Sequence, residues 1–86
     1  MTNKQIEKNF ASMKKVTPGM EYTKTKEEYI VTIFKLYSFG RVEIQRHIDI
    51  GTIKQAWNPI QYIVNETQFA INQLNATCRN FEGRTA

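Results

Sequence analysis

The alternation of apolar and polar residues divides the chain into five patterned segments, and the first predicts a helix over Thr2–Val16. Apolar residues recur there at helical spacing: Ile6, Phe10, Met13 and Val16. Thr2 followed by Gln5 fits a capping box at the start of this helix. The sequence Thr17-Pro18-Gly19 predicts its end, because proline disfavours helical geometry in the residue before it.

The next three segments predict an antiparallel meander of strands. Met20–Thr25 alternates weakly and is typical of an edge strand. Tyr29–Ser38 is apolar on both faces, as expected of a central strand that is covered on both sides. Arg41–Ile50 alternates cleanly, and only Arg46 interrupts its inward set. The inward residues are Val42, Ile44, Ile48 and Ile50, and the outward residues are Arg41, Glu43, Gln45, His47 and Asp49.

The turn between the second and third strands decides which face of Tyr29–Ser38 is buried. A two-residue turn at Phe39-Gly40 would direct one set of side chains toward the core: Tyr29, Val31, Ile33 and Tyr37. A loop that differs by one residue would bury the other set: Ile30, Phe34 and Leu36. The sequence leaves both registers open.

Asn58-Pro59 predicts the start of a long C-terminal helix, since asparagine is a good N-cap and proline suits the first helical position. We expect this helix to run to about Asn80, with a frayed tail at residues 83–86. The segment Thr52–Trp57 before it fits either one helical turn or a loop. The stripe along the helix consists of Ile60, Ile63, Val64, Thr67, Ile71, Leu74, Cys78 and Phe81.

Together these elements predict one small α+β domain over residues 1–86, in the order α-β-β-β-α. The C-terminal helix should pack on one face of the sheet, with the N-terminal helix either beside it or on the other face. A chain of 86 residues suits a single domain with a thin core. One cysteine excludes an internal disulfide, and no signal peptide or membrane-length apolar run is visible, so we expect a cytoplasmic protein.

Candidate catalytic and metal-binding groups are few. Cys78 falls on the predicted buried stripe, where a thiol is neither ionised nor reachable. His47 faces outward beside Glu43 and Asp49 and could act as a general base, although a solvated surface histidine is the simpler interpretation. Metal-ligand spacing and a glycine-rich phosphate loop are both absent from the sequence. We therefore expect no catalytic site, no cofactor and no metal.

The net charge of +4 resides in residues 1–26, since the rest of the chain carries equal numbers of basic and acidic residues. The order of elements resembles in outline the double-stranded-RNA-binding domain. That family has a lysine-rich start to its last helix, whereas this chain has Asn58-Pro59-Ile60-Gln61-Tyr62, so membership does not follow. Basic groups beside aromatic ones still suit single-stranded nucleic acid, and Lys35 and Tyr37 would join them in one register. The candidate nucleic-acid-binding residues are Lys4, Lys8, Lys14, Lys15, Arg41, Gln45 and His47.

Aromatic residues outside the clearest core positions predict a surface for a protein partner, because such residues often anchor interfaces. The candidates are Phe39, Trp57, Tyr62 and Phe69. A small chain rich in asparagine and lysine resembles the accessory proteins of bacteriophages and mobile elements. Our main hypothesis is therefore a non-enzymatic inhibitor or regulator that binds a host protein or nucleoprotein complex, with homodimer formation as another protein contact. Binding of RNA or single-stranded nucleic acid is the alternative.

Overall fold

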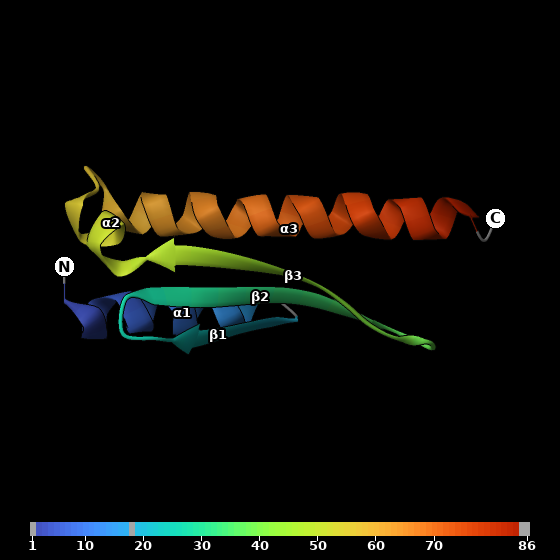
Figure 1. The fold of residues 1–86 in the computed structure, drawn as a ribbon, viewed down its shortest axis with the longest axis horizontal. Helices are drawn as coiled ribbons and strands as arrows, with labels where there is room; N and C mark the ends of the chain where they lie inside the picture. The colour runs from blue at the N-terminus through green and yellow to red at the C-terminus, as the bar shows by residue number, and fades with distance from the viewer. Residues whose placement is uncertain (1, 18, 85–86) are drawn as a thin grey trace.

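The computed structural model describes the backbone of residues 2–17 and 19–84 and the side chains of residues 2–17 and 19–80. The predicted α+β fold with the order α-β-β-β-α is confirmed. A short additional helix precedes the last one, and it includes residues 52–55 of the segment that fitted either a helical turn or a loop, so that part of the segment is helical. The elements are α1 (Asn3–Val16), β1 (Met20–Lys24), β2 (Glu28–Tyr37), β3 (Gly40–Asp49), α2 (Ile50–Gln55) and α3 (Pro59–Arg84), as Figure 1 shows.

The ends of α1 follow from local chemistry. The Thr2 hydroxyl accepts a hydrogen bond from the Gln5 N–H at 3.2 Å, and the Gln5 side chain accepts one from the Thr2 N–H at 2.8 Å. This reciprocal pair is the predicted capping box, which satisfies two backbone donors that lack helical partners. The helix ends at Val16 as predicted, while Pro18 lies outside the described residues.

Side-chain caps also fix the starts of α2 and α3. The Asp49 carboxylate accepts a hydrogen bond from the Thr52 N–H at 2.9 Å, which ends β3 one residue earlier than predicted and makes Ile50 the first residue of α2. The Asn58 side-chain oxygen accepts one from the Gln61 N–H at 3.1 Å, so the predicted N-cap of the last helix is confirmed. α3 continues to Arg84 and thus includes the first part of the predicted tail, while residues 85–86 lie outside the described residues.

The three strands form an antiparallel sheet in the order β1-β2-β3, with β2 in the centre and β1 at an edge as predicted. The hairpin turns at Ser38-Phe39, where Tyr37 pairs with Gly40, and not at Phe39-Gly40. The turn still contains two residues, as predicted. Because the loop length is the same, each side chain of the two strands points to the face that a turn at Phe39-Gly40 would have given it. The structure accordingly buries the first of the two sets, with Tyr29, Val31 and Ile33 in the core.

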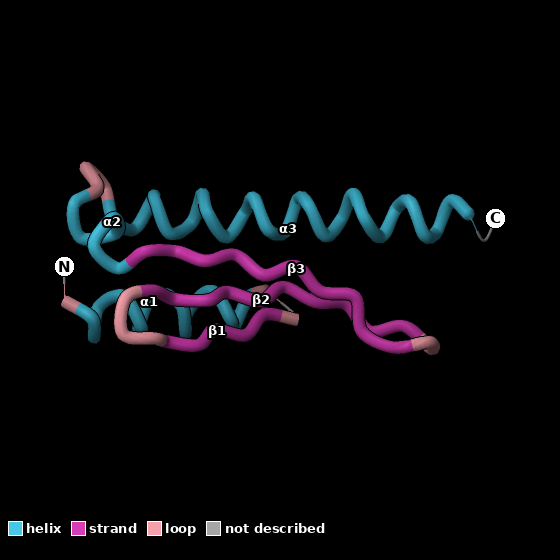
Figure 2. The backbone as a smooth tube through the Cα atoms, viewed as in Figure 1, coloured by secondary structure: helices cyan, strands magenta, loops and turns pink. Residues whose placement is uncertain are grey.

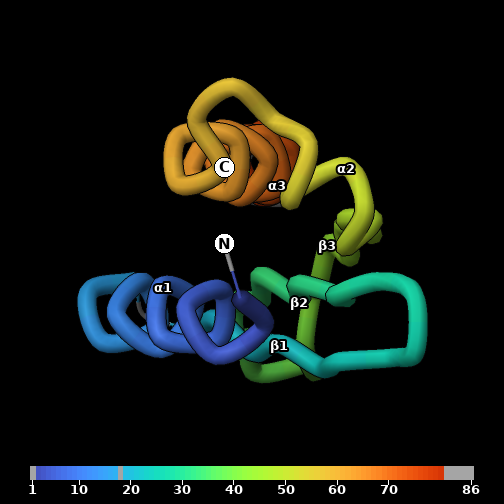
Figure 3. Tube along the Cα trace, turned by 90° about the vertical axis from the view of Figure 1, so that its left-hand side faces the viewer, coloured from blue at the N-terminus to red at the C-terminus, as the bar shows by residue number. Residues whose placement is uncertain are grey.

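Both long helices lie on the same face of the sheet, which Figure 3 shows from the end of the molecule. Phe10 of α1 packs against Tyr29, with ring centroids 5.0 Å apart, and Arg46 on the same face pairs with Glu66 of α3. The N-terminal helix therefore lies beside the C-terminal helix. The expectation that β2 is covered on both sides is wrong, and Leu36 on the opposite, outer face is 71% exposed.

The core is a single layer between the helices and the sheet. Because each helix contacts the sheet along one narrow stripe, residues on the flank of a predicted stripe remain exposed. Val16, Ile60 and Val64 are such residues, so their predicted burial is wrong, whereas the burial of Cys78 is confirmed. The side chain of Phe81 lies outside the described residues. The core consists of Ile6, Phe10, Met20, Tyr29, Val31, Ile33, Ile48, Ile50, Ile53, Ile63, Ala70, Leu74 and Cys78.

The hairpin of β2 and β3 extends well past β1, as Figure 2 shows. β1 pairs with β2 only from Tyr29 to Ile33, whereas β3 pairs with β2 from Glu28 to Tyr37. α3 reaches as far along the molecule as this extension, but the tip of the hairpin bends away from the helix. The distal part of β2 therefore has a strand neighbour on one side only.

Candidate interaction surfaces

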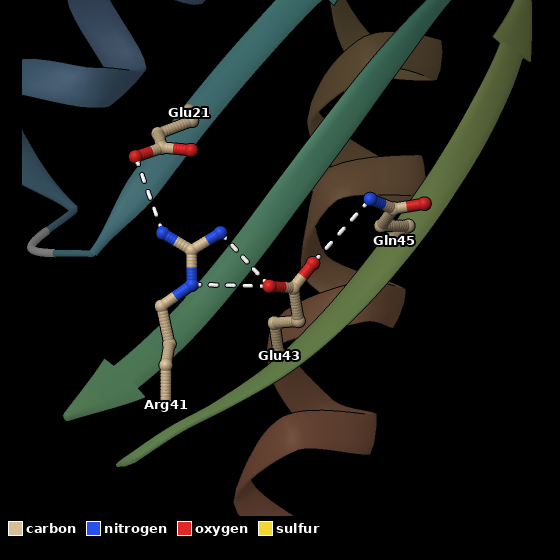
Figure 4. A network of polar contacts seen from close by, with 4 residues as sticks. All are labelled: Glu21, Arg41, Glu43 and Gln45. Carbon is tan, nitrogen blue, oxygen red and sulfur yellow. Dashed lines mark hydrogen bonds and ion pairs between the residues drawn. The ribbon is translucent and has the colours of Figure 1, made fainter. Parts of the chain in front are cut away.

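The outer face of the sheet carries a network of polar side chains centred on Arg41, shown in Figure 4. The guanidinium of Arg41 donates to Glu43 at 2.8 and 3.0 Å and to Glu21 on β1 at 3.4 Å. Gln45 donates to the other carboxylate oxygen of Glu43 at 3.3 Å. The same guanidinium lies over the ring of Phe34, 4.5 Å from its centroid. Long polar side chains thus cover part of the apolar surface that β2 presents on this face.

The charge of the outer face is negative. His47 contacts Glu28 at 2.9 Å between Nδ1 and Oε1, so this strand position also faces a carboxylate. Arg41, Gln45 and His47 do share the face that the sequence predicted, but each contacts a glutamate. The face carries the glutamates Glu21, Glu28 and Glu43 against Arg41. Such a surface repels the phosphates of nucleic acid.

The predicted basic residues of the first helix lie elsewhere. Lys4, Lys8, Lys14 and Lys15 are all exposed on α1, and the last two occupy its final turn, where positive charge interacts favourably with the helix dipole. α1 packs on the buried face of the sheet, opposite the outer face. The structure therefore divides the predicted nucleic-acid-binding residues between two opposite sides of the molecule.

The four predicted partner-binding aromatics do not form one cluster. Phe39 lies at the tip of the hairpin and stacks on Tyr37, with ring centroids 5.2 Å apart. Trp57 lies between α2 and α3, at the end of the molecule remote from that tip. Tyr62 and Phe69 lie on the flank of α3 that faces β3, where Arg46 extends over the ring of Phe69 at 5.2 Å. A role of these residues in partner binding stays a prediction, and the sequence did not show how they are distributed over the molecule.

Arg46 explains the one interruption in the inward set of β3. Its guanidinium forms an ion pair with Glu66 of α3 at a half-buried position, so an inward arginine ties the strand to the helix. Burial raises the pKa of the neighbouring Tyr62, and the negative charge of Glu66 raises it further. Tyr62 is therefore part of the contact between α3 and β3.

The start of α3 presents an exposed apolar surface that the sequence interpretation placed partly in the core. Trp57 is fully exposed, Ile60 is 49% exposed and Val64 is 40% exposed. Ile60 and Val64 are one turn apart, so they share a side of the helix. We call these three residues the Trp57 surface. The burial of Ile60 and Val64 was mispredicted because helical spacing shows that residues share a stripe, not which flank of that stripe has a neighbour.

Within the Trp57 surface, Ile60 borders α1. A hollow of about 370 Å³ lies between Ile60 in the first turn of α3 and the first three turns of α1. The α1 residues around this hollow are Gln5, Lys8, Asn9 and Ser12. An apolar surface on one helix therefore adjoins polar and basic side chains on the other.

A second hollow, of about 490 Å³, lies where β1 begins, and we call it the β1-end hollow. It is bounded by the turn before β1, by the distal half of β2 and by the middle of α3. Among the described side chains, its lining is mainly apolar and includes the charged residue Lys35. The lining residues are Thr17, Gly19, Ile33, Phe34, Lys35, Leu36, Ile71, Leu74 and Asn75.

Potential catalytic and metal-binding groups are dispersed in the described part of the chain. Cys78 is buried in the core between the helices and the sheet, whereas His47 lies on the outer face of the sheet. Among the described side chains, no three histidine, cysteine or carboxylate groups come together in a way that could hold a metal ion. Within the same residues, no helix combines the length and hydropathy needed to cross a lipid bilayer.

Comparison with known proteins gives no relative from which a site could be transferred. No protein-family model, curated protein or solved structure matches this chain.

Proposed function

We propose that this protein is a non-enzymatic binding protein that contacts a partner protein through the Trp57 surface. The observation that carries the proposal is the full exposure of Trp57, three residues before the half-exposed Ile60 in the sequence. Tryptophan is among the residues that contribute most to binding energy when a partner buries them. A fully exposed tryptophan at the start of a helix with further exposed apolar residues in its first turns is therefore a suitable anchor for an interface.

Trp57 has no evident role in the fold. Trp57 directly precedes the N-cap residue Asn58. A hydrophobic side chain at the position of Trp57 can pack against the fourth residue of the helix, which here is Tyr62. The complete exposure of Trp57 means that this contact is absent. The Asn58 side chain and backbone already accept hydrogen bonds from Gln61 and Tyr62, so the helix start is satisfied without it.

The charge beside the Trp57 surface favours a partner with acidic residues. Lys8 lines the hollow next to Ile60, and the other lysines of α1 are exposed on the same helix. Complementary charge speeds association and selects among partners. The composition favours a role as inhibitor or regulator of a host protein, in the manner of phage or mobile-element accessory proteins.

The test is affinity capture from lysate treated with nuclease, with the wild type and two matched variants as bait. We expect Trp57→Ala to lose the captured protein while its thermal stability stays unchanged, because the side chain makes no buried contact. Phe39→Ala is the control, since it removes an exposed aromatic at the other end of the molecule. Equal capture by the wild type and Trp57→Ala would refute the proposed surface.

A second candidate, nucleic-acid binding, is supported by the four exposed lysines of α1. The acidic outer face of the sheet limits such binding to the helical side of the molecule. Binding through phosphates weakens steeply with salt, whereas binding through an apolar surface does not. Fluorescence anisotropy with mixed single-stranded RNA at low salt tests this candidate, and Lys8→Ala with Lys15→Ala should then weaken binding. A flat titration at low salt would exclude it.

A further inference from the structure

The strand β3 is an edge of the sheet along its whole length. It pairs with β2 on one side, and no described strand lies on its other side. The Phe34 N–H donates to the Gly19 carbonyl just before β1, so the even-numbered residues of β2 direct their backbone groups toward β1 and the odd-numbered residues toward β3. The odd-numbered residues of β2 pair with even-numbered residues of β3. The backbone groups of the odd-numbered β3 residues therefore point to the open edge.

These outward backbone groups have no hydrogen-bond partner among the described residues. They belong to Arg41, Glu43, Gln45 and His47, and Asp49 follows as the last residue of the strand. The side chains of all five are exposed on the outer face of the sheet, where α3 does not cover them. A long open strand edge of this kind is a template for pairing with another chain.

The order of side chains along β3 is largely self-complementary about Gln45. The residues at equal distances from this centre are Arg41 with Asp49, Val42 with Ile48, Glu43 with His47, and Ile44 with Arg46. Two of these pairs join a carboxylate to a basic group, one is apolar, and the last is the exception. When two identical strands pair antiparallel about a two-fold axis at Gln45, the members of each pair stand opposite each other, and pairs of opposite charge or of apolar side chains stabilise a sheet.

The same register suits the backbone. An axis at Gln45 sets odd-numbered residues opposite odd-numbered residues, so the outward N–H and C=O groups of one strand meet those of the other. An axis between two residues would set outward groups against groups that already bond to β2. Charges on an edge strand repel a copy when mirrored positions carry the same sign, whereas here the mirrored charges attract.

We infer that the protein forms a homodimer in which the β3 strands of two copies pair edge to edge about a two-fold axis at Gln45. The two sheets then form one antiparallel sheet of six strands. The pairing uses none of the Trp57 surface, so either interaction can exist without the other.

The side chains on the outer face have atoms left for the second copy. His47 contacts Glu28 through Nδ1, so its Nε2 remains for Glu43 of the second copy. Both hydrogen bonds that Asp49 accepts from Thr52 use Oδ2, so Oδ1 remains for an arginine of the second copy. That arginine, Arg41, gives up its 3.4 Å contact with the carboxylate on β1, an exposed ion pair that contributes little to stability.

The test is sedimentation velocity of the full chain from about 10 μM to about 1 mM, where we expect a concentration-dependent dimer. Gln45→Lys and Gln45→Glu should each weaken the dimer at least about tenfold, because each sets two like charges opposite each other at the axis. An equimolar mixture of these two variants should dimerise again, since unlike charges then meet. A monomeric wild type at about 1 mM, or a mixture no more dimeric than either variant alone, would overturn the inference.

Two controls locate the contact. Thr23→Lys adds a charge to the same outer face but on β1, so it should dimerise as the wild type does. The Glu43 and His47 amides should exchange hydrogen more slowly at high protein concentration, whereas the Ile44 amide, which points toward β2, should be protected at every concentration. Equal weakening by Thr23→Lys, or exchange at Glu43 and His47 that does not change with concentration, would overturn edge pairing of β3.

Discussion

At the scale of single residues, Gly19 is a position where both backbone conformation and packing exclude a side chain. Its φ is 74°, and a Cβ atom would stand 2.2 Å from the Phe34 carbonyl oxygen. We expect Gly19→Ala to lower the free energy of unfolding by about 2 kcal/mol or more, measured by urea denaturation. Gly40→Ala is the control, since Gly40 has a φ of 142° but no atom within 4 Å of the added carbon. Equal losses in the two variants would contradict the role of the close contact.

Tyr29 gives a prediction about pH. Burial, followed by the charge of Glu7, raises the pKa of the Tyr29 hydroxyl from 10.0 to about 12. The unfolded chain therefore ionises at lower pH than the folded one, and the stability that the neutral phenol supplies is lost as the pH rises from about 10 to about 12. Urea denaturation across this range should show a steeper loss for the wild type than for Tyr29→Phe. Parallel curves would contradict it.

At the scale of elements, α3 depends on its first turn. Asn58→Ala removes the acceptor for the Gln61 N–H, and we expect the free energy of unfolding to fall by about 1 kcal/mol. Asn58→Asp keeps an acceptor at the same position and should retain most of that stability. Thermal or urea denaturation of the three proteins measures both effects. A loss as large in Asn58→Asp as in Asn58→Ala would show that the cap does not stabilise the helix start.

The hairpin and the helices differ in how far the sequence determines them. The number of residues in a turn sets which strand face is buried, so Tyr29 and Val31 could be placed in the core although the turn lies one residue earlier than predicted. The sequence left two positions open for α1, because an amphipathic helix can pack on either face of a sheet. The same limit applies to Ile60 and Val64, because an amphipathic pattern does not show whether a neighbouring element covers their side of α3.

At the scale of the whole molecule, the negative charge of the outer face and the positive charge of α1 lie on opposite sides of the sheet. The outer face is acidic, while the helical side carries the α1 lysines and the Trp57 surface. The sequence showed that positive charge is concentrated in residues 1–26. It could not show that Arg41 and His47 would lie near glutamates from other strands, because those contacts depend on strand register. The helical side is therefore the side from which we expect an acidic partner to approach.

The central claim is that a partner protein buries Trp57, and the most direct measurement is fluorine NMR of the protein labelled with fluorotryptophan. The chain contains a single tryptophan, so the spectrum has one signal to follow. In buffer, we expect this signal to have the solvent sensitivity of an exposed indole. In nuclease-treated lysate that contains the partner, it should shift or broaden and lose that sensitivity. An unchanged Trp57 signal in a sample where the partner is bound would contradict the account.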